Sequence, residues 1–140
     1  MSMTNKQLIL CNEVEQISLL GEYIDTIVEE AGLSPELGMS LNLALEEAVT
    51  NVVLYAYPEG EKGEVKIDAS WNHEMVTFVI SDSGVPFDPT EKEDADITLS
   101  VEERPIGGLG IFLVKQIMDS VEYQRIEGKN VLTISKHINM

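Results

Sequence analysis

The 140-residue chain has few basic residues and a single cysteine. Nine Lys and Arg stand against 25 Asp and Glu, which gives a formal net charge of −16. Nucleic-acid-binding proteins need a basic surface, and anionic membranes attract basic segments, so this charge argues against both as direct partners. Because Cys11 has no second cysteine to pair with, an internal disulfide framework is excluded and a reducing compartment is expected.

Long apolar runs are also missing from the sequence. No segment approaches the about 20 apolar residues of a membrane-spanning helix, and the polar start lacks the apolar region of a signal peptide. We therefore expect a cytoplasmic protein that does not associate with membranes. A chain of this length forms one core that buries roughly two-thirds of its unfolded surface, so residues 1–140 are predicted to form a single domain.

Apolar periodicity predicts a chain that mixes strands and helices. Helices are predicted at residues 13–31, 35–57 and 109–118, and strands at 4–11, 64–71, 75–81, 121–126 and 131–137. Gly32 ends the first helix, while Ser34 and Pro35 are typical of the start of the second. Since much of the strand pairing is by hairpins, we expect an α/β sandwich with a mixed, mostly antiparallel sheet and helices on one face.

The first motif that suggests chemistry lies on the second predicted helix, within the sequence Glu-Glu-Ala-Val-Thr-Asn. Glu47 and Asn51 are four residues apart, so their side chains lie one turn from each other on the same face. The Asn51 oxygen suits a hydrated Mg²⁺, which leaves Glu47 free to accept a proton. Taken alone, the pair is better explained as part of an exposed helix face with no such role, because acidic helix faces are common.

A second motif, Asp-Ser-Gly-Val-Pro-Phe-Asp-Pro, directly follows a predicted strand. Asp82, at the end of that strand, can accept a hydrogen bond from an exocyclic amine, and Gly84 allows the backbone to approach a flat ring. All of these residue types also form ordinary turns. The motif is therefore weak when it is considered by itself.

Three glycines in four residues open the last predicted helix. They are Gly107, Gly108 and Gly110. Free N–H groups at the start of a helix bind phosphate, and glycines allow phosphate to come close. The spacing excludes the dinucleotide-binding G-x-G-x-x-G pattern, and the chain has no P-loop sequence.

The three motifs, in this order and on these elements, resemble the GHKL ATPase superfamily, which includes gyrase B, Hsp90, MutL and the histidine kinases. Within it, Glu-Glu-Ala-Val-Thr-Asn, Asp-Ser-Gly-Val-Pro-Phe-Asp-Pro and Arg-Pro-Ile-Gly-Gly-Leu-Gly-Ile-Phe-Leu-Val are similar to the anti-sigma-factor serine/threonine kinases. The resemblance extends over nearly the whole chain. It implies a Bergerat-type fold with an ATP lid at about residues 90–106, and ATP and Mg²⁺ as cofactors.

The resemblance also implies a role for each matching residue. It makes Glu47 the general base and Asn51 the Mg²⁺ ligand. Near adenine it places Asp82 as acceptor of the amino group, Gly84 beside the ring, and Thr133 as support for Asp82. Near the phosphates it places the second glycine box, which consists of Gly107, Gly108 and Gly110.

Two points depart from a simple match. Glu46 is also acidic, but it lies about 100° from Glu47 around the helix and five residues from Asn51, so Glu47 is preferred as the base. The lid is mostly acidic, and Arg104 is the best candidate there for a contact with the γ-phosphate or a partner, followed by Lys115 outside it. A weak surface ion pair between Arg104 and its neighbouring glutamates is an equally good interpretation.

In this branch the γ-phosphate of ATP goes to a serine or threonine of an antagonist with a STAS fold, an anti-anti-sigma protein, and the kinase sequesters a sigma factor. The resemblance also suggests a homodimer. Two alternatives stay open: a non-catalytic ATP-binding module that sequesters a partner, and a detached ATPase domain of a histidine-kinase-like system. Glu47 favours catalysis, and the lack of a phosphoacceptor histidine motif counts against the last alternative.

Overall fold

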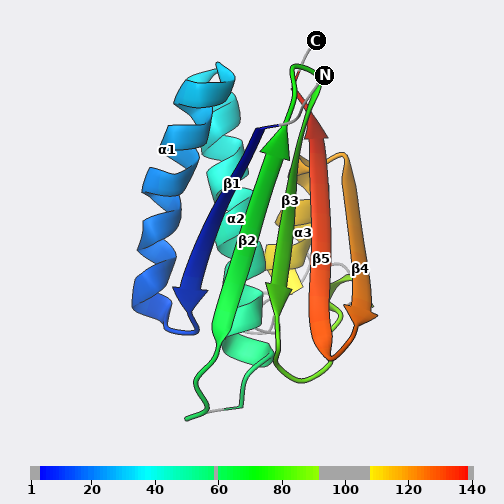
Figure 1. The fold of residues 1–140 in the computed structure, drawn as a ribbon. Coiled ribbons are helices and arrows are strands. Elements are labelled where there is room, and N and C mark those ends of the chain that lie inside the picture. Colours follow the sequence, from blue (N-terminus) through cyan, green and yellow to red (C-terminus); the bar gives the residue numbers. More distant parts are fainter. Residues whose placement is uncertain (1–3, 59, 92–107, 139–140) are drawn as a thin grey trace.

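The computed structural model describes residues 4–58, 60–91 and 108–138. Five strands form one sheet in the order β1-β2-β3-β5-β4, and every neighbouring pair is antiparallel. The strands are β1 (Thr4–Cys11), β2 (Glu64–Trp71), β3 (Met75–Asp82), β4 (Ser120–Ile126) and β5 (Lys129–His137). Three helices cover one face of this sheet (Figure 1): α1 (Leu19–Ala31), α2 (Pro35–Tyr55) and α3 (Gly108–Ile117). This arrangement confirms the predicted α/β architecture.

Local signals in the sequence explain where the first two helices begin and end. A 3-10 helix, η1 (Val14–Ser18), precedes α1, so the regular helix starts later than its apolar pattern suggested. Gly32 ends α1 in the left-handed conformation with φ of 69°, which glycine adopts without strain. The hydroxyl of Ser34 accepts a hydrogen bond from the Leu37 N–H at 3.2 Å and so caps α2.

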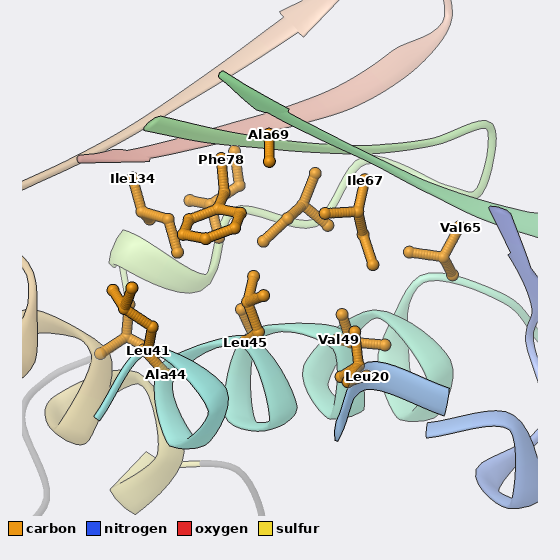
Figure 2. Packing of buried hydrophobic residues seen from close by; sticks show 14 of the residues in the cluster. Leu20, Leu41, Ala44, Leu45, Val49, Val65, Ile67, Ala69, Phe78 and Ile134 are labelled. Atoms are coloured by element: carbon orange, nitrogen blue, oxygen red, sulfur yellow. The ribbon is translucent and has the colours of Figure 1, made fainter. Parts of the chain in front are cut away.

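The hydrophobic core lies between α2 and the sheet. Strands β2 and β3 alternate buried and less buried residues along their lengths, as expected when helices cover only one face. Figure 2 shows side chains of α2 pointing toward side chains of the sheet: Leu41, Leu45 and Val49 from the helix, and Ile67, Phe78 and Ile134 from the strands. This packing fixes the position of α2 against the strand ends that carry the polar motifs.

The turn between β4 and β5 sets the register at one edge of the sheet. It contains two residues, Glu127 and Gly128, which both have positive φ values of 49° and 80°. Such turns match the twist of antiparallel strands and fix their pairing. On its other side β5 pairs with β3, and there Asn130 lies directly opposite Asp82.

A further 3-10 helix, η2 (Pro89–Glu91), follows the loop after β3. Most of the predicted lid, and with it Arg104 and Gly107, lies outside the described residues. Among the helices that the structure describes, none has both the length and the apolar character needed to cross a membrane.

Candidate functional site

A small cavity lies between α2 and the ends of β3 and β5. Its polar lining comes from Asn51 on α2, Asp82 on β3, Tyr123 on β4 and Asn130 on β5. Its apolar lining comes from Ala48, Val52, Ile80, Phe87, Pro89 and Leu132. The cavity thus brings together Asn51 and Asp82, which are 31 residues apart in the sequence, as the motif analysis required.

The cavity is nearly closed in this structure. Its volume is about 10 Å³, which is close to the minimum for a single water molecule. One wall is the Phe87 ring, which stacks on Tyr55 with 5.4 Å between ring centroids. A planar ligand much larger than water therefore enters only if the lining of the cavity rearranges.

Asp82 is a buried carboxylate whose hydrogen bonds converge on one oxygen. Only 4% of the residue is exposed. Its Oδ1 accepts a hydrogen bond from the Gly84 N–H at 2.8 Å and another from Nδ2 of Asn130 at 2.9 Å. Burial raises the pKa of the Asp82 carboxyl above its ordinary value, and these two hydrogen bonds partly oppose the rise. A group of this kind is typical of a binding site rather than of a plain turn.

Gly84 is required by the protein itself. A Cβ at this position would lie 2.2 Å from the carbonyl oxygen of Ala56, at the end of α2. The same carbonyl accepts a hydrogen bond from the Val85 N–H at 2.7 Å, and Nη1 of Arg125 donates to the Gly84 carbonyl at 2.9 Å. From the sequence, Gly84 was expected to allow a ligand ring to come close. In the structure, the close approach is between Gly84 and the carbonyl of Ala56 at the end of α2.

Tyr57 fastens the loop after β3 to the end of α2. Its hydroxyl accepts a hydrogen bond from the Ser83 N–H at 3.0 Å and donates one to the Glu64 carbonyl at 2.8 Å. Because Ser83 follows Asp82 directly, these bonds also restrain the backbone beside the buried carboxylate.

Asn51 places an amide in the cavity, and the nitrogen of that amide is unpaired among the described residues. The residue is 2% exposed, and its Nδ2 has no hydrogen-bond partner within the described part of the chain. A buried polar atom without a partner is costly, and the two ends of an amide are assigned from their partners rather than observed. An external ligand that accepts a hydrogen bond from this nitrogen removes the cost, and the oxygen at the other end of the same amide is a possible ligand for a cation.

The residues around Asn51 fit a Mg²⁺ ion. The ion prefers oxygen ligands and usually keeps several waters with few protein ligands. Residues 4–58, 60–91 and 108–138 hold no group of three or more His, Cys, Asp or Glu side chains arranged to bind a metal. The oxygen of the Asn51 amide, one helical turn from the Glu47 carboxylate, would supply such a sparse set of ligands.

The two neighbouring glutamates of α2 have different surroundings. Burial raises the pKa of Glu47 above its ordinary value, and the nearby Glu46 carboxylate adds to the rise. Glu46 instead accepts a hydrogen bond at 3.0 Å from Nδ2 of Asn42, one turn earlier. Glu46 is therefore already paired along the helix, and this difference supports Glu47 as the proton acceptor.

Thr133 is not brought to Asp82. It lies on β5 between the buried residues Leu132 and Ile134, and successive side chains of a strand point to opposite faces. Thr133 is therefore on the sheet face that the helices leave uncovered, whereas Asp82 lies on the covered face. Asn130 occupies the position beside Asp82 that the resemblance gave to Thr133.

None of the sequence motifs includes Asn130, although the sequence holds a signal for it. Asn130, Leu132 and Ile134 alternate along the last strand, and all three are buried. A single amide at an inward position needs polar partners in the core. The pairing of Asn130 with Asp82 across the sheet follows from the order of the strands, which the sequence does not state.

The glycine box is described only in part. Gly108 and Gly110 belong to the first turn of α3, which begins at Gly108. Lys115 is in the last turn of the same helix. The expected phosphate contacts of the glycines and of Arg104 stay predictions.

Comparisons with known proteins agree with these features. A family model described as the histidine kinase-like ATPase domain matches residues 10–136. The serine-protein kinase RsbW of Listeria monocytogenes serovar 1/2a is 34% identical over 129 residues, which cover 89% of this chain and 82% of that protein. RsbW of Bacillus cereus strain Q1 is 31% identical over 134 residues, with 88% and 82% covered. The serine/threonine-protein kinase BtrW of Bordetella bronchiseptica is 30% identical over 104 residues, with 74% and 73% covered. These similarities confirm the resemblance inferred from the motifs.

Proposed function

Because the chain belongs to the family of histidine kinase-like ATPase domains, we propose that it is an ATP-dependent protein serine/threonine kinase that also acts as an anti-sigma factor. Its phosphoryl acceptor is a STAS-domain anti-anti-sigma protein, and its sequestered partner is a sigma factor. The proposal is carried by one observation: the buried amide of Asn51 shares a cavity with the buried carboxylate of Asp82, and Glu47 lies one helical turn from that amide.

In phosphoryl transfer, positioning and charge neutralisation supply most of the catalysis. Asp82 receives the amino group of adenine, and Asn51 offers an oxygen to Mg²⁺, which when bound offsets the charge of the phosphates. The first turn of α3, with Gly108 and Gly110, offers backbone N–H groups to the phosphates. Glu47 takes the proton from the attacking hydroxyl, and its raised pKa makes it a better base than an ordinary exposed carboxylate.

The charge of the protein supports a basic partner. A net charge of −16 repels a polyanion and attracts basic surfaces, and α1 carries exposed acids at Glu22, Asp25 and Glu29. The DNA-binding surface of a sigma factor is basic, so we propose that the acidic surface binds it in place of nucleic acid. Sigma binding is then expected to weaken as salt rises, and binding that is insensitive to salt contradicts this part of the proposal. We also propose that the protein is a homodimer and that it is located in the cytoplasm.

The direct test is phosphoryl transfer from Mg·ATP to a STAS-domain protein of the same organism, with phosphoserine or phosphothreonine identified by mass spectrometry. Glu47→Ala is expected to lower kcat by about 100-fold or more, which is the usual contribution of a general base. Glu46→Ala is the matched control, because Glu46 is the adjacent acid but is bonded to Asn42. Transfer that survives Glu47→Ala unchanged contradicts the role of Glu47.

The main alternative is a module that binds ATP and sequesters a partner without phosphorylating it. Such a module needs Asn51 and Asp82 but no base, so the environment of Glu47 favours a kinase. Intact Mg·ATP binding without transfer to any STAS-domain protein supports the module instead. A detached ATPase domain is distinguished by transfer to a histidine-containing domain.

A further inference from the structure

The side chain of Asn130 uses all of its hydrogen-bonding capacity inside the protein. Its Nδ2 donates to Oδ1 of Asp82 at 2.9 Å and to the Val85 carbonyl at 2.8 Å. Its Oδ1 accepts from the Phe87 N–H at 3.1 Å and from the Tyr123 hydroxyl. Two donors and two acceptor sites are the full capacity of one amide, and the residue is only 4% exposed.

These partners define which end of the Asn130 amide is nitrogen. The carboxylate of Asp82 and the carbonyl of Val85 can only accept, and the Phe87 N–H can only donate. A flipped amide would lose all three bonds, so the orientation is fixed by the chemistry of the neighbours. Asn130 therefore joins β3, the segment at residues 85–87 and β4 in a single arrangement.

The network leaves one oxygen of Asp82 for a ligand. Within the described part of the chain, the hydrogen bonds to this carboxylate end on Oδ1, from Gly84 and from Asn130. The carboxylate is thereby held in one rotation, and no hydrogen bond from the described residues ends on its Oδ2. Because Asp82 lines the cavity, a ligand amine that enters there meets an acceptor whose position is already set.

We infer that Asn130 is the positioning residue for base recognition, which holds Asp82 and the segment at residues 85–87 so that Oδ2 of Asp82 receives the amino group of an adenine base. The inference rests on the proposed binding of ATP. It goes further because it assigns the choice of an amino-bearing purine to a residue that does not itself contact the base. Asparagine is required here because only an amide of this length both donates twice and accepts twice.

The substitution Asn130→Asp tests this role with almost no change in shape. The new carboxylate still accepts hydrogen bonds from Phe87 and Tyr123. It cannot donate to Asp82 or to the Val85 carbonyl, which are themselves acceptors, so both of these hydrogen bonds are lost. At pH 8 the two carboxylates repel each other, or they share a proton, and in both cases Oδ2 of Asp82 loses its position. Asn72→Asp is the matched control, because Oδ1 of Asn72 only accepts, from the Glu74 and Met75 N–H groups.

Two nucleotides distinguish loss of amino-group recognition from a general loss of nucleotide binding. They are Mg·ATP and Mg·purine riboside triphosphate, which lacks the amino group. We expect Asn130→Asp to raise the Kd of Mg·ATP about tenfold or more, the usual effect of a lost hydrogen bond to a charged group. The Kd of the analogue is expected to change less than about threefold, and Asn72→Asp to change neither. With saturating Mg·ATP, kcat for transfer stays close to that of the unaltered protein while KM rises, because the lost interaction acts on binding alone.

An equal loss of affinity for both nucleotides, with the fold intact by circular dichroism, overturns the inference and leaves the proposed function standing. An unaltered protein that binds neither nucleotide refutes the proposed function, and this inference with it. If Asn130→Asp does not fold, the side-chain amide signals of Asn130 in the unaltered protein provide the test by NMR. ATP is expected to shift them more than the analogue does, and an equal response overturns the inference.

Discussion

The carbonyl oxygen of Ala56 lies 2.2 Å from the point at which a side chain on Gly84 would begin. Backbone atoms cannot move aside as a flexible side chain can, so even a methyl group displaces the loop after β3 from the end of α2. Asp82 is two residues from Gly84 and accepts a hydrogen bond from its N–H. The contact therefore links the packing of a helix end to the geometry of the cavity.

We expect Gly84→Ala to lower the free energy of unfolding by about 2 to 3 kcal/mol, the usual range for overpacking, and to weaken ATP binding. Gly21→Ala is the control, since a Cβ on Gly21, within α1, meets nothing within 4 Å. There the change is expected to raise the free energy of unfolding by about 0.5 to 1 kcal/mol. Urea denaturation measures both, and a Gly84→Ala protein as stable as the unaltered one contradicts the contact.

The same substitution at Asn51 and Asn130 is expected to have opposite effects on stability. Asn51→Leu removes a buried amide nitrogen that lacks a partner and so raises the free energy of unfolding by about 1 kcal/mol, while Mg·ATP binding is lost. Asn130→Leu leaves the partners of four hydrogen bonds unsatisfied and lowers the free energy of unfolding by about 3 kcal/mol. Chemical denaturation and calorimetric titration with Mg·ATP test the pair. If Asn51→Leu destabilises the fold, the Asn51 amide has a structural role.

The pKa of Asp82 predicts how stability depends on pH. Because burial raises this pKa in the folded state, the folded protein binds a proton more readily than the unfolded chain between the ordinary carboxyl value near 3.9 and the raised value. The contribution of Asp82 to stability therefore falls as pH rises through that interval. We expect Asp82→Asn to flatten this part of the stability curve measured by urea denaturation, and an unchanged slope argues against the raised pKa.

Arg104 is the predicted contact for the γ-phosphate or a partner. A comparison of phosphoryl transfer with Mg·ATP binding tests this role. We expect Arg104→Ala to lower the rate of phosphoryl transfer about tenfold or more, as loss of an arginine near the transferred group does, with a smaller effect on the Kd of Mg·ATP. Lys92→Ala, which removes the other basic residue of the predicted lid, serves as control. Equal loss of both activities, or no loss of either, rejects the role.

Much of the fold followed from the sequence because its signals are local. The alternation in β2 and β3 and the cap of α2 at Ser34 depend on neighbouring residues, and the structure has these elements where they were expected. The prediction of where the first helix starts was less accurate, because the apolar pattern continues through the 3-10 helix before Leu19. Periodicity does not distinguish these two kinds of helix.

The site was predictable where a motif carried it and not where it depends on register. Asn51 and Asp82 belong to motifs, and the structure brings both to one cavity. The choice between Thr133 and Asn130 depends on which face of β5 each one occupies, and a shift of one residue reverses the faces. Only the pairing of β5 with β3 shows that Asn130 is the neighbour of Asp82.

The hairpin of β4 and β5 contributes more than an edge to the sheet. It carries Tyr123, Arg125 and Asn130, while β3 carries Asp82, so the proposed base site is complete only while the hairpin is packed against β3. If the chain binds ATP as proposed, a bound nucleotide would hold the hairpin against β3, because an opening between β3 and β5 breaks the hydrogen bond from Asn130 to Asp82. Amide hydrogens across this junction should then exchange more slowly with nucleotide present, whereas those between β1 and β2 should change little.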